Sequence, residues 1–126
     1  MHWLLVFLGG GIGAAARHGV NRIAMAWLGP AFPWGTLAVN VIGSLAMGLL
    51  IATFASVPGG VSNNLRLFLA TGVLGGFTTF SAFSLDALTL WERGQALPAL
   101  GYIAASLIMS LAAIAAGLLL GRSILS

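Results

Sequence analysis

The sequence near residue 75 places flexible backbone and hydroxyl groups inside an otherwise apolar run. The residues concerned are Gly72, Gly75, Gly76, Thr78, Thr79 and Ser81. Backbone polar groups in hydrocarbon must be hydrogen-bonded, so an irregular segment is tolerated only where it is buried in protein or lines a cavity. Freed carbonyls can bind a cation there, and freed N–H groups can bind an anion. Alternatively, Gly72 and Gly76, at GxxxG spacing, only let two helices approach closely; the adjoining hydroxyls favour an ion or lumen role.

Polar residues in two other apolar runs recur every four positions. One series is Thr36, Asn40, Ser44 and Gly48, and the other is Tyr102, Ser106 and Ser110. On a helix this spacing puts each series along a single face. Hydroxyl and amide groups can donate hydrogen bonds to an anion or can join one helix to another. Both uses are open for the hydroxyls, whereas the Asn40 amide is harder to attribute to packing because its burial is costly.

Two phenylalanines and one arginine could also meet an anion. Phe80 and Phe83 lie three residues apart just after the glycine-rich interruption, and the edges of their rings carry partial positive charge. Packing or lipid contact is the alternative role for both rings. Arg17 lies within the first apolar run, where a guanidinium must snorkel, pair or face water. It could concentrate anions at a pore mouth or anchor the end of a helix.

Several chemistries are excluded by residues that the sequence lacks. Asp86 and Glu92 are the only acids, which leaves little for a proton- or cation-coupled carrier. His2 and His18 are far apart and unaccompanied, and there is no Cys, so no side-chain metal site is expected. The five Arg residues are scattered singly, which argues against a nucleic-acid partner. No nucleophile and base pair is recognisable, and we do not expect an enzyme.

The elements that carry these residues are predicted to be membrane helices. The chain is 60% hydrophobic and 6% charged, and residues 23–65 and 94–121 carry no formal charge. A helix of about 20 apolar residues crosses the roughly 30 Å hydrocarbon core of a bilayer. The apolar runs lack the period-2 alternation of a β-barrel. We therefore expect an all-α integral membrane protein.

Turn and charge signals divide the chain into four spans within a single membrane domain of residues 1–126. The predicted helices cover about 3–28, 33–57, 65–90 and 98–120, and the third is broken at mid-membrane near residues 75–79. A cleaved signal peptide is the alternative for residues 1–16, but that segment begins without Lys or Arg and its apolar pattern continues past residue 16.

The arginines give almost no orientation signal. If helices alternate in direction, Arg66 and Arg122 fall on one side of the membrane and Arg22 and Arg93 on the other. Lys and Arg in short loops normally decide which side is cytoplasmic, and here the two sides balance. This balance predicts insertion in both orientations and an antiparallel homodimer with its two-fold axis in the membrane plane. A fixed topology set by the first helix is the alternative.

Three ordered motifs resemble the Fluc (CrcB-type) fluoride channels. They are GGGIGAAAR at residues 9–17, FPWGTLAVNVIGS at residues 32–44 and GGFTTFS at residues 75–81. The similarity covers all four predicted helices in order. It implies an antiparallel, dual-topology homodimer with two pores in the bacterial cytoplasmic (inner) membrane. Such a protein passes fluoride passively out of the cytoplasm and so relieves fluoride toxicity.

The resemblance also implies roles for individual residues. A structural sodium ion at the dimer centre would be bound by the backbone carbonyls of Gly75 and Thr78, and Arg17 would lie in the anion vestibule. The pore residues implied are Asn40, Phe80, Ser81 and Phe83, with Tyr102, Ser106 and Ser110 on weaker local similarity. Ala82 stands where the family commonly has Thr, so one hydroxyl of its polar track is absent. We expect this difference to affect conduction rate more than ion identity.

The chemistry of these residues agrees with the resemblance, because amides, hydroxyls and ring edges can replace a small anion's hydration without trapping it on a cation. A small dual-topology multidrug carrier is one alternative, but such carriers usually have a Glu in the first helix, and residues 3–28 contain no acid. A non-transporting membrane assembly subunit is another, and it would leave the polar interruption without a use.

Overall fold

The computed structural model describes residues 1–125, and every regular element in that range is helical. The elements are α1 (His2–Leu28), α2 (Trp34–Ser56), α3 (Asn63–Arg66), the π-helical segment η1 (Leu67–Leu74), α4 (Gly75–Phe77), α5 (Phe80–Glu92) and α6 (Ala96–Leu125). Four stretches are long and apolar enough to cross a membrane, with Asn63–Glu92 forming the third. The prediction of an all-α protein with four membrane-length helices is confirmed.

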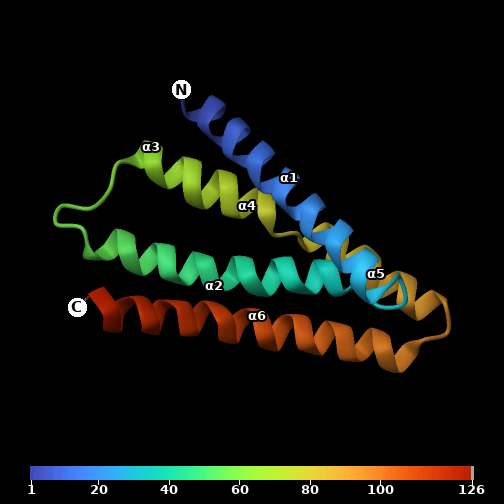
Figure 1. Ribbon diagram of the computed structural model, residues 1–126. Coiled ribbons are helices and arrows are strands. Elements are labelled where there is room, and N and C mark those ends of the chain that lie inside the picture. Colours follow the sequence, from blue (N-terminus) through green and yellow to red (C-terminus); the bar gives the residue numbers. More distant parts are fainter. Residues whose placement is uncertain (126) are drawn as a thin grey trace.

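The helices run up and down between two ends of the molecule. The α1–α2 and α5–α6 connections lie at one end, and the α2–α3 connection and both termini lie toward the other (Figure 1). Positive-φ glycines shape the connections: Gly29 follows α1, Gly59 and Gly60 follow α2, and Gly94 follows α5. Glycine adopts this conformation without the steric penalty that other residues meet, so each helix can end sharply.

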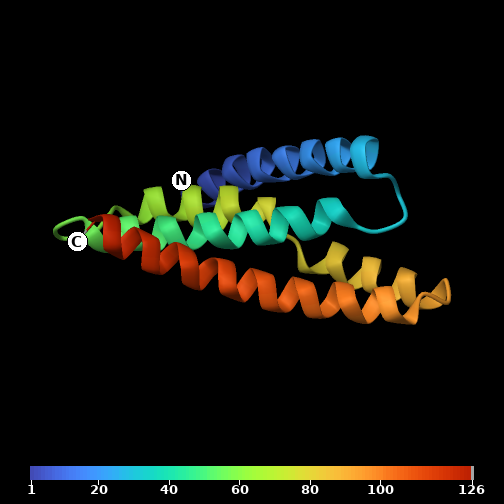
Figure 2. The ribbon, with the colours of Figure 1, turned by 60° about the horizontal axis from the view of Figure 1, so that its bottom comes forward.

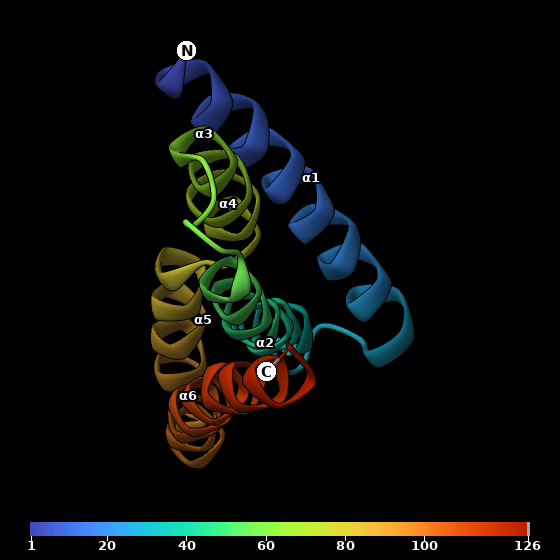
Figure 3. The same cartoon turned by 90° about the vertical axis from the view of Figure 1, so that its left-hand side faces the viewer.

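Helix α2 lies at the centre of the bundle. Seen from the end, it is flanked by α1 and the η1–α4 segment on one side and by α5 and α6 on the other (Figure 3). The turned view separates the same groups and shows α6 running along α2 for most of its length (Figure 2). Only 11–33% of the residues in the apolar windows of the four spans are buried within the chain. Most of each helix surface is therefore available to lipid or to another chain.

Glycines set the two closest helix contacts. A Cβ at Gly117 of α6 would lie 2.9 Å from the Leu49 nitrogen of α2, and a Cβ at Gly48 would lie 3.0 Å from the Gly117 Cα. On the other side of α2, a Cβ at Gly76 would lie 2.9 Å from the Gly10 Cα of α1. No side chain fits at these separations. The close helix approach expected from GxxxG spacing is present at η1 and α4.

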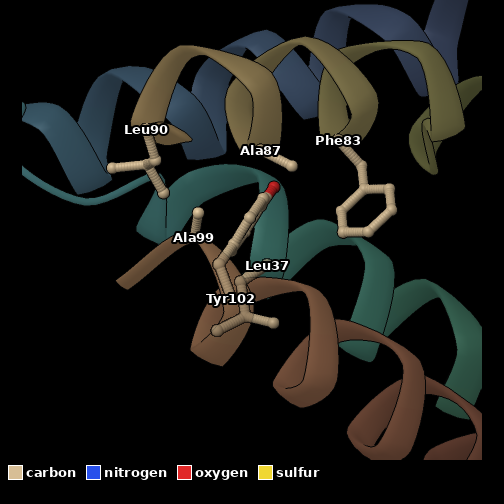
Figure 4. Packing of buried hydrophobic residues seen from close by; sticks show 6 residues of the cluster. All are labelled: Leu37, Phe83, Ala87, Leu90, Ala99 and Tyr102. Carbon is tan, nitrogen blue, oxygen red and sulfur yellow. The ribbon is translucent and has the colours of Figure 1, made fainter. Parts of the chain in front are cut away.

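A small aromatic and aliphatic core joins α2, α5 and α6. Its buried members are Leu37, Phe83, Ala87, Leu90, Ala99 and Tyr102. Tyr102 is fully buried and extends from α6 toward α5, with its hydroxyl between the two helices (Figure 4). Helix α6 begins at Ala96, earlier than the predicted start at Pro98. Pro98 is compatible with the first helical turn, because N–H groups there have no intrahelical acceptor.

Candidate functional site

The polar segment of the third span leaves the helical conformation at two residues. Helix α4 ends at Phe77, Thr78 and Thr79 are extended, and α5 begins at Phe80. The connection is visible as a thin, non-helical stretch of chain between α4 and α5 (Figure 1). The Thr79 hydroxyl accepts a hydrogen bond from the Ala82 N–H at 3.1 Å and so caps α5. The Thr78 hydroxyl donates to the Leu74 carbonyl at 3.1 Å and closes the preceding turn.

Asn40 of α2 hydrogen-bonds both backbone groups of Thr79. Its Nδ2 donates to the Thr79 carbonyl at 3.0 Å, and its Oδ1 accepts from the Thr79 N–H at 2.8 Å. The side chain thus replaces two backbone partners that a continuous helix would have supplied. One N–H of the amide remains available for another acceptor.

Arg17 of α1 reaches the same segment from another direction. Its Nε donates to the Gly76 carbonyl at 3.2 Å, and the side chain is half-buried. Gly13, one helical turn earlier on the same face of α1, packs so closely on α4 that a Cβ there would lie 2.7 Å from the Phe77 nitrogen. The structure therefore brings Arg17 to the backbone of the interruption.

Hydrogen bonding leaves three carbonyls of this segment open. The Gly76 and Thr79 carbonyls accept from Arg17 and Asn40. The Gly75, Phe77 and Thr78 carbonyls accept no hydrogen bond from any group in residues 1–125. Within the same residues, no cluster of three or more acidic or His side chains could bind a metal ion. Backbone oxygens are thus the cation ligands that the segment offers.

A cavity of about 350 Å³ lies beside the extended segment, between α2, α5 and α6. Its lining includes Asn40, Ser44, Thr78, Thr79, Phe80, Phe83, Ser106 and Ser110 and contains no charged side chain. The hydroxyl oxygens of Ser106 and Ser110 are buried and have no hydrogen-bond partner in the described chain. Buried hydroxyls are almost always paired, so these two groups are available to a ligand or water.

The two phenylalanines predicted for the site have different surroundings. Phe80 is 74% exposed, whereas Phe83 is 8% exposed and belongs to the core. Their ring centroids are 5.5 Å apart, and both rings line the cavity. Within a single chain, Phe83 therefore packs in the core and also lines the cavity, whereas most of the surface of Phe80 is not covered by other residues.

Tyr102 and Ser81 lie outside the lining of this cavity. Tyr102 packs against Phe83, with ring centroids 5.3 Å apart, and its hydroxyl donates to Asp86 Oδ2 at 3.3 Å. Ser81 is exposed, and its hydroxyl is 3.4 Å from that of Thr79. Asp86, which accepts the hydrogen bond from Tyr102, was not predicted from the sequence to belong to the site. Its spacing of three residues from Phe83, which places both on one face of α5, was the available signal.

A second cavity, of about 310 Å³, lies under the α1–α2 connection and against α5. Its lining includes Asn21, Thr36, Ala82, Asp86 and Arg93. Unlike the first cavity, it contains both an acid and an arginine. Asp86 lines this cavity and is linked through Tyr102 to Phe83 in the wall of the other one.

The chain is similar to a family of known proteins over nearly its whole length. Residues 4–118 match the family model described as CrcB-like protein, Camphor Resistance (CrcB). A protein of Mesorhizobium japonicum named "Fluoride-specific ion channel FluC" is 59% identical over 121 residues, which cover 96% of each chain. Proteins of the same name from Chelativorans sp. and Paracoccus denitrificans are 59% and 57% identical, and the aligned region covers 95–98% of each chain.

Proposed function

This chain belongs to the CrcB-like (Fluc) family of fluoride channels, and we infer that it conducts fluoride passively across the membrane. It is a multi-pass membrane protein and a transporter, and it is not an enzyme. The relatives compared above are bacterial. We place the protein in the bacterial cytoplasmic membrane, where it would release fluoride and so limit its toxicity.

The observation that carries this function is the uncharged donor lining of the cavity beside Thr79. The groups that it offers to an anion are the Asn40 amide, the Ser106 and Ser110 hydroxyls and the edges of two phenylalanine rings. A strongly hydrated anion can give up water where such donors replace the lost hydrogen bonds. Since no cation lines the cavity, the anion is not held by a deep electrostatic trap and can leave.

We propose that the conducting unit is an antiparallel homodimer of oppositely inserted chains. Two features support this proposal: Phe80, at the cavity, is 74% exposed, and Gly75, whose carbonyl is open, is also exposed. A second chain could cover both residues and complete the cavity wall. The balanced arginines give neither insertion an advantage, since α1 and α5 carry Arg22 and Arg93 at or near their C-terminal ends and α3 and α6 carry Arg66 and Arg122 toward the other end (Figure 1).

The Gly75 and Thr78 carbonyls are proposed to bind a structural sodium ion at the dimer centre. The fit rests on their hydrogen bonding: both are open, whereas the Gly76 and Thr79 carbonyls are occupied by side chains. An inverted second copy would bring a matching pair of oxygens to the same axis. Hard cations such as sodium prefer oxygen ligands, and the ion would neutralise carbonyl dipoles that otherwise face one another.

The remaining residues have proposed roles that follow from their positions. Ser81, Ser106 and Ser110 would supply hydroxyl donors along the path of the anion. Tyr102 would hold the Phe83 ring in position by packing against it from outside the cavity. The remaining donors of the Arg17 guanidinium would attract anions toward the mouth of the pore.

Fluoride-electrode recording on liposomes that contain the purified protein tests this function. We expect passive fluoride efflux and no chloride efflux under the same gradient. Proton-coupled uptake of a cationic drug would instead identify a multidrug carrier, and the absence of both activities would identify an assembly subunit. Protein-free liposomes are the control.

A further inference from the structure

Two side chains from different helices hydrogen-bond the backbone at the interruption of the third span. Arg17 of α1 bonds the Gly76 carbonyl, and Asn40 of α2 bonds the Thr79 N–H and carbonyl. We propose that Arg17 and Asn40 are positioning residues that together form a clamp, and that this clamp determines which backbone carbonyls remain open to a cation. The inference rests on the proposed sodium site and assigns to both residues a function that is separate from contact with the anion.

The Arg17 arm depends on how closely α1 approaches α4. Arg17 lies one turn after Gly13, and a Cβ at Gly13 would overlap the backbone of η1 and α4. At this short separation the Nε group, rather than the end of the guanidinium, reaches the Gly76 carbonyl at 3.2 Å. The close approach at Gly13 therefore determines which atom of the Arg17 side chain reaches the Gly76 carbonyl.

The Asn40 arm has the same construction on α2. Gly43 follows Asn40 by three residues, and a Cβ at Gly43 would clash with the Thr78 side chain. With α2 this close, the amide can bond both polar groups of one residue, at 2.8 and 3.0 Å. The two bonds also fix the direction of the amide, so its remaining N–H has one orientation and cannot exchange places with the oxygen.

The clamp occupies two of the five backbone carbonyls between residues 75 and 79 and leaves the other three open. Gly75 and Thr78 are open, and each is followed directly by a residue whose carbonyl is bonded by the clamp. If Arg17 released Gly76, that carbonyl would also become available near the axis and the segment could shift its register. Cation binding would then require a higher concentration, because the two ligand carbonyls would no longer be held in place.

The chemistry of the Arg17 side chain allows a test with opposed outcomes. Glutamine places an amide nitrogen at the same number of bonds from Cα as the arginine Nε, but it has no charge. Lysine keeps the charge and places a methylene group at that position. Arg17→Gln therefore preserves the clamp and removes the charge, whereas Arg17→Lys does the reverse. Arg22→Lys is the matched control, since Arg22 is exposed on the same helix.

The measurement is hydrogen–deuterium exchange at the Thr78 and Thr79 amides in the intact protein with sodium present, together with the sodium concentration that half-stabilises the dimer. For Arg17→Lys we expect exchange to rise and the sodium requirement to increase by about tenfold, as for the loss of one buried hydrogen bond. We expect Arg17→Gln and Arg22→Lys to stay close to the wild type. Asn40→Leu should raise exchange at Thr79 in the same way.

The clamp is refuted if Arg17→Lys matches the wild type in both measurements, or if Arg17→Gln is as impaired as Arg17→Lys. The first result would mean that charge alone matters, and the second that an N–H group at this position is not sufficient. Failure of the underlying sodium site gives a different result, because the wild-type dimer would then show no sodium dependence. Loss of the channel function itself would appear as absent fluoride efflux in the wild type.

Discussion

Replacement of Phe80 by isoleucine separates the electrostatic role of the ring from its packing. Isoleucine keeps apolar bulk but lacks the positive ring edge. A hydrogen bond to a charged group contributes about 1.5–3 kcal/mol, and we take the contact between a ring edge and a bare anion to be of the same kind. Since about 1.4 kcal/mol at the barrier corresponds to a tenfold change in rate, we expect the rate of fluoride efflux to fall by about tenfold to a hundredfold.

The neighbouring ring provides an internal comparison. Phe83 contacts two rings, Phe80 at 5.5 Å and Tyr102 at 5.3 Å, and it is 8% exposed. Each aromatic pair contributes about 0.5–1.5 kcal/mol beyond area burial, so Phe83→Ile should lower stability by about 1–3 kcal/mol. Phe80 shares only one of these contacts and is 74% exposed, so Phe80→Ile should affect packing within the chain less. Both variants should lose flux.

The assay is fluoride-electrode efflux from liposomes, with size-exclusion chromatography to show that each variant is folded and assembled. Leu85→Ile is the control, because Leu85 is an exposed apolar residue on the same helix. If both phenylalanine variants conduct like the wild type, the rings are packing residues and the path of the anion must lie elsewhere.

Three further predictions follow from the contacts between helices, the open carbonyls and the arginine balance. Gly117→Ala should destabilise the protein by about 1–3 kcal/mol, because the added methyl group meets the backbone of α2. Gly101→Ala is the control, since a methyl group there enters open space. Equal melting temperatures for the two variants would contradict this prediction. Replacing sodium by a bulky organic cation should shorten the lifetime of the dimer and reduce flux, and the account fails here if both persist after exhaustive sodium removal. A reporter fused to the C-terminus should give signal on both sides of the membrane, and a signal on one side only would argue for a fixed topology. Lys residues added beside Arg122 should bias insertion and impair flux until an oppositely biased copy is supplied.

The four spans could be predicted because a helix that crosses the bilayer must consist mostly of apolar, uncharged residues. Charge-free runs and turn residues such as Pro58 and Gly94 give the helix ends to within two residues of those in the structure, except that α6 continues to Leu125, five residues past its predicted end. The irregular conformation at Thr78 and Thr79 follows from local residues as well, since glycines weaken the helix before them and the Thr79 hydroxyl caps the next one. The stripe of polar residues on α2 likewise faces its neighbours: Thr36 lines one cavity and Asn40 the other.

The partners of individual side chains could not be predicted, because they depend on distances between helices far apart in the sequence. Arg17 and the Gly76 carbonyl are separated by 59 positions, and Asn40 and Thr79 by 39. Each bond requires helix axes brought together by glycines, and no local pattern encodes that separation. Periodicity grouped Tyr102 with Ser106 and Ser110 and placed Asp86 on the same face as Phe83, but it did not pair Asp86 with Tyr102, which it meets only after α5 and α6 have packed.

Electrogenic fluoride efflux tests the central claim most directly. Liposomes that contain the protein and a high internal concentration of potassium fluoride are diluted into fluoride-free buffer without a proton gradient, and a potassium ionophore is then added. A passive fluoride channel should release fluoride promptly on addition of the ionophore, and vesicles loaded with potassium chloride should retain chloride. Fluoride that stays inside until a proton gradient is imposed, or chloride that leaves at a similar rate, would contradict the account.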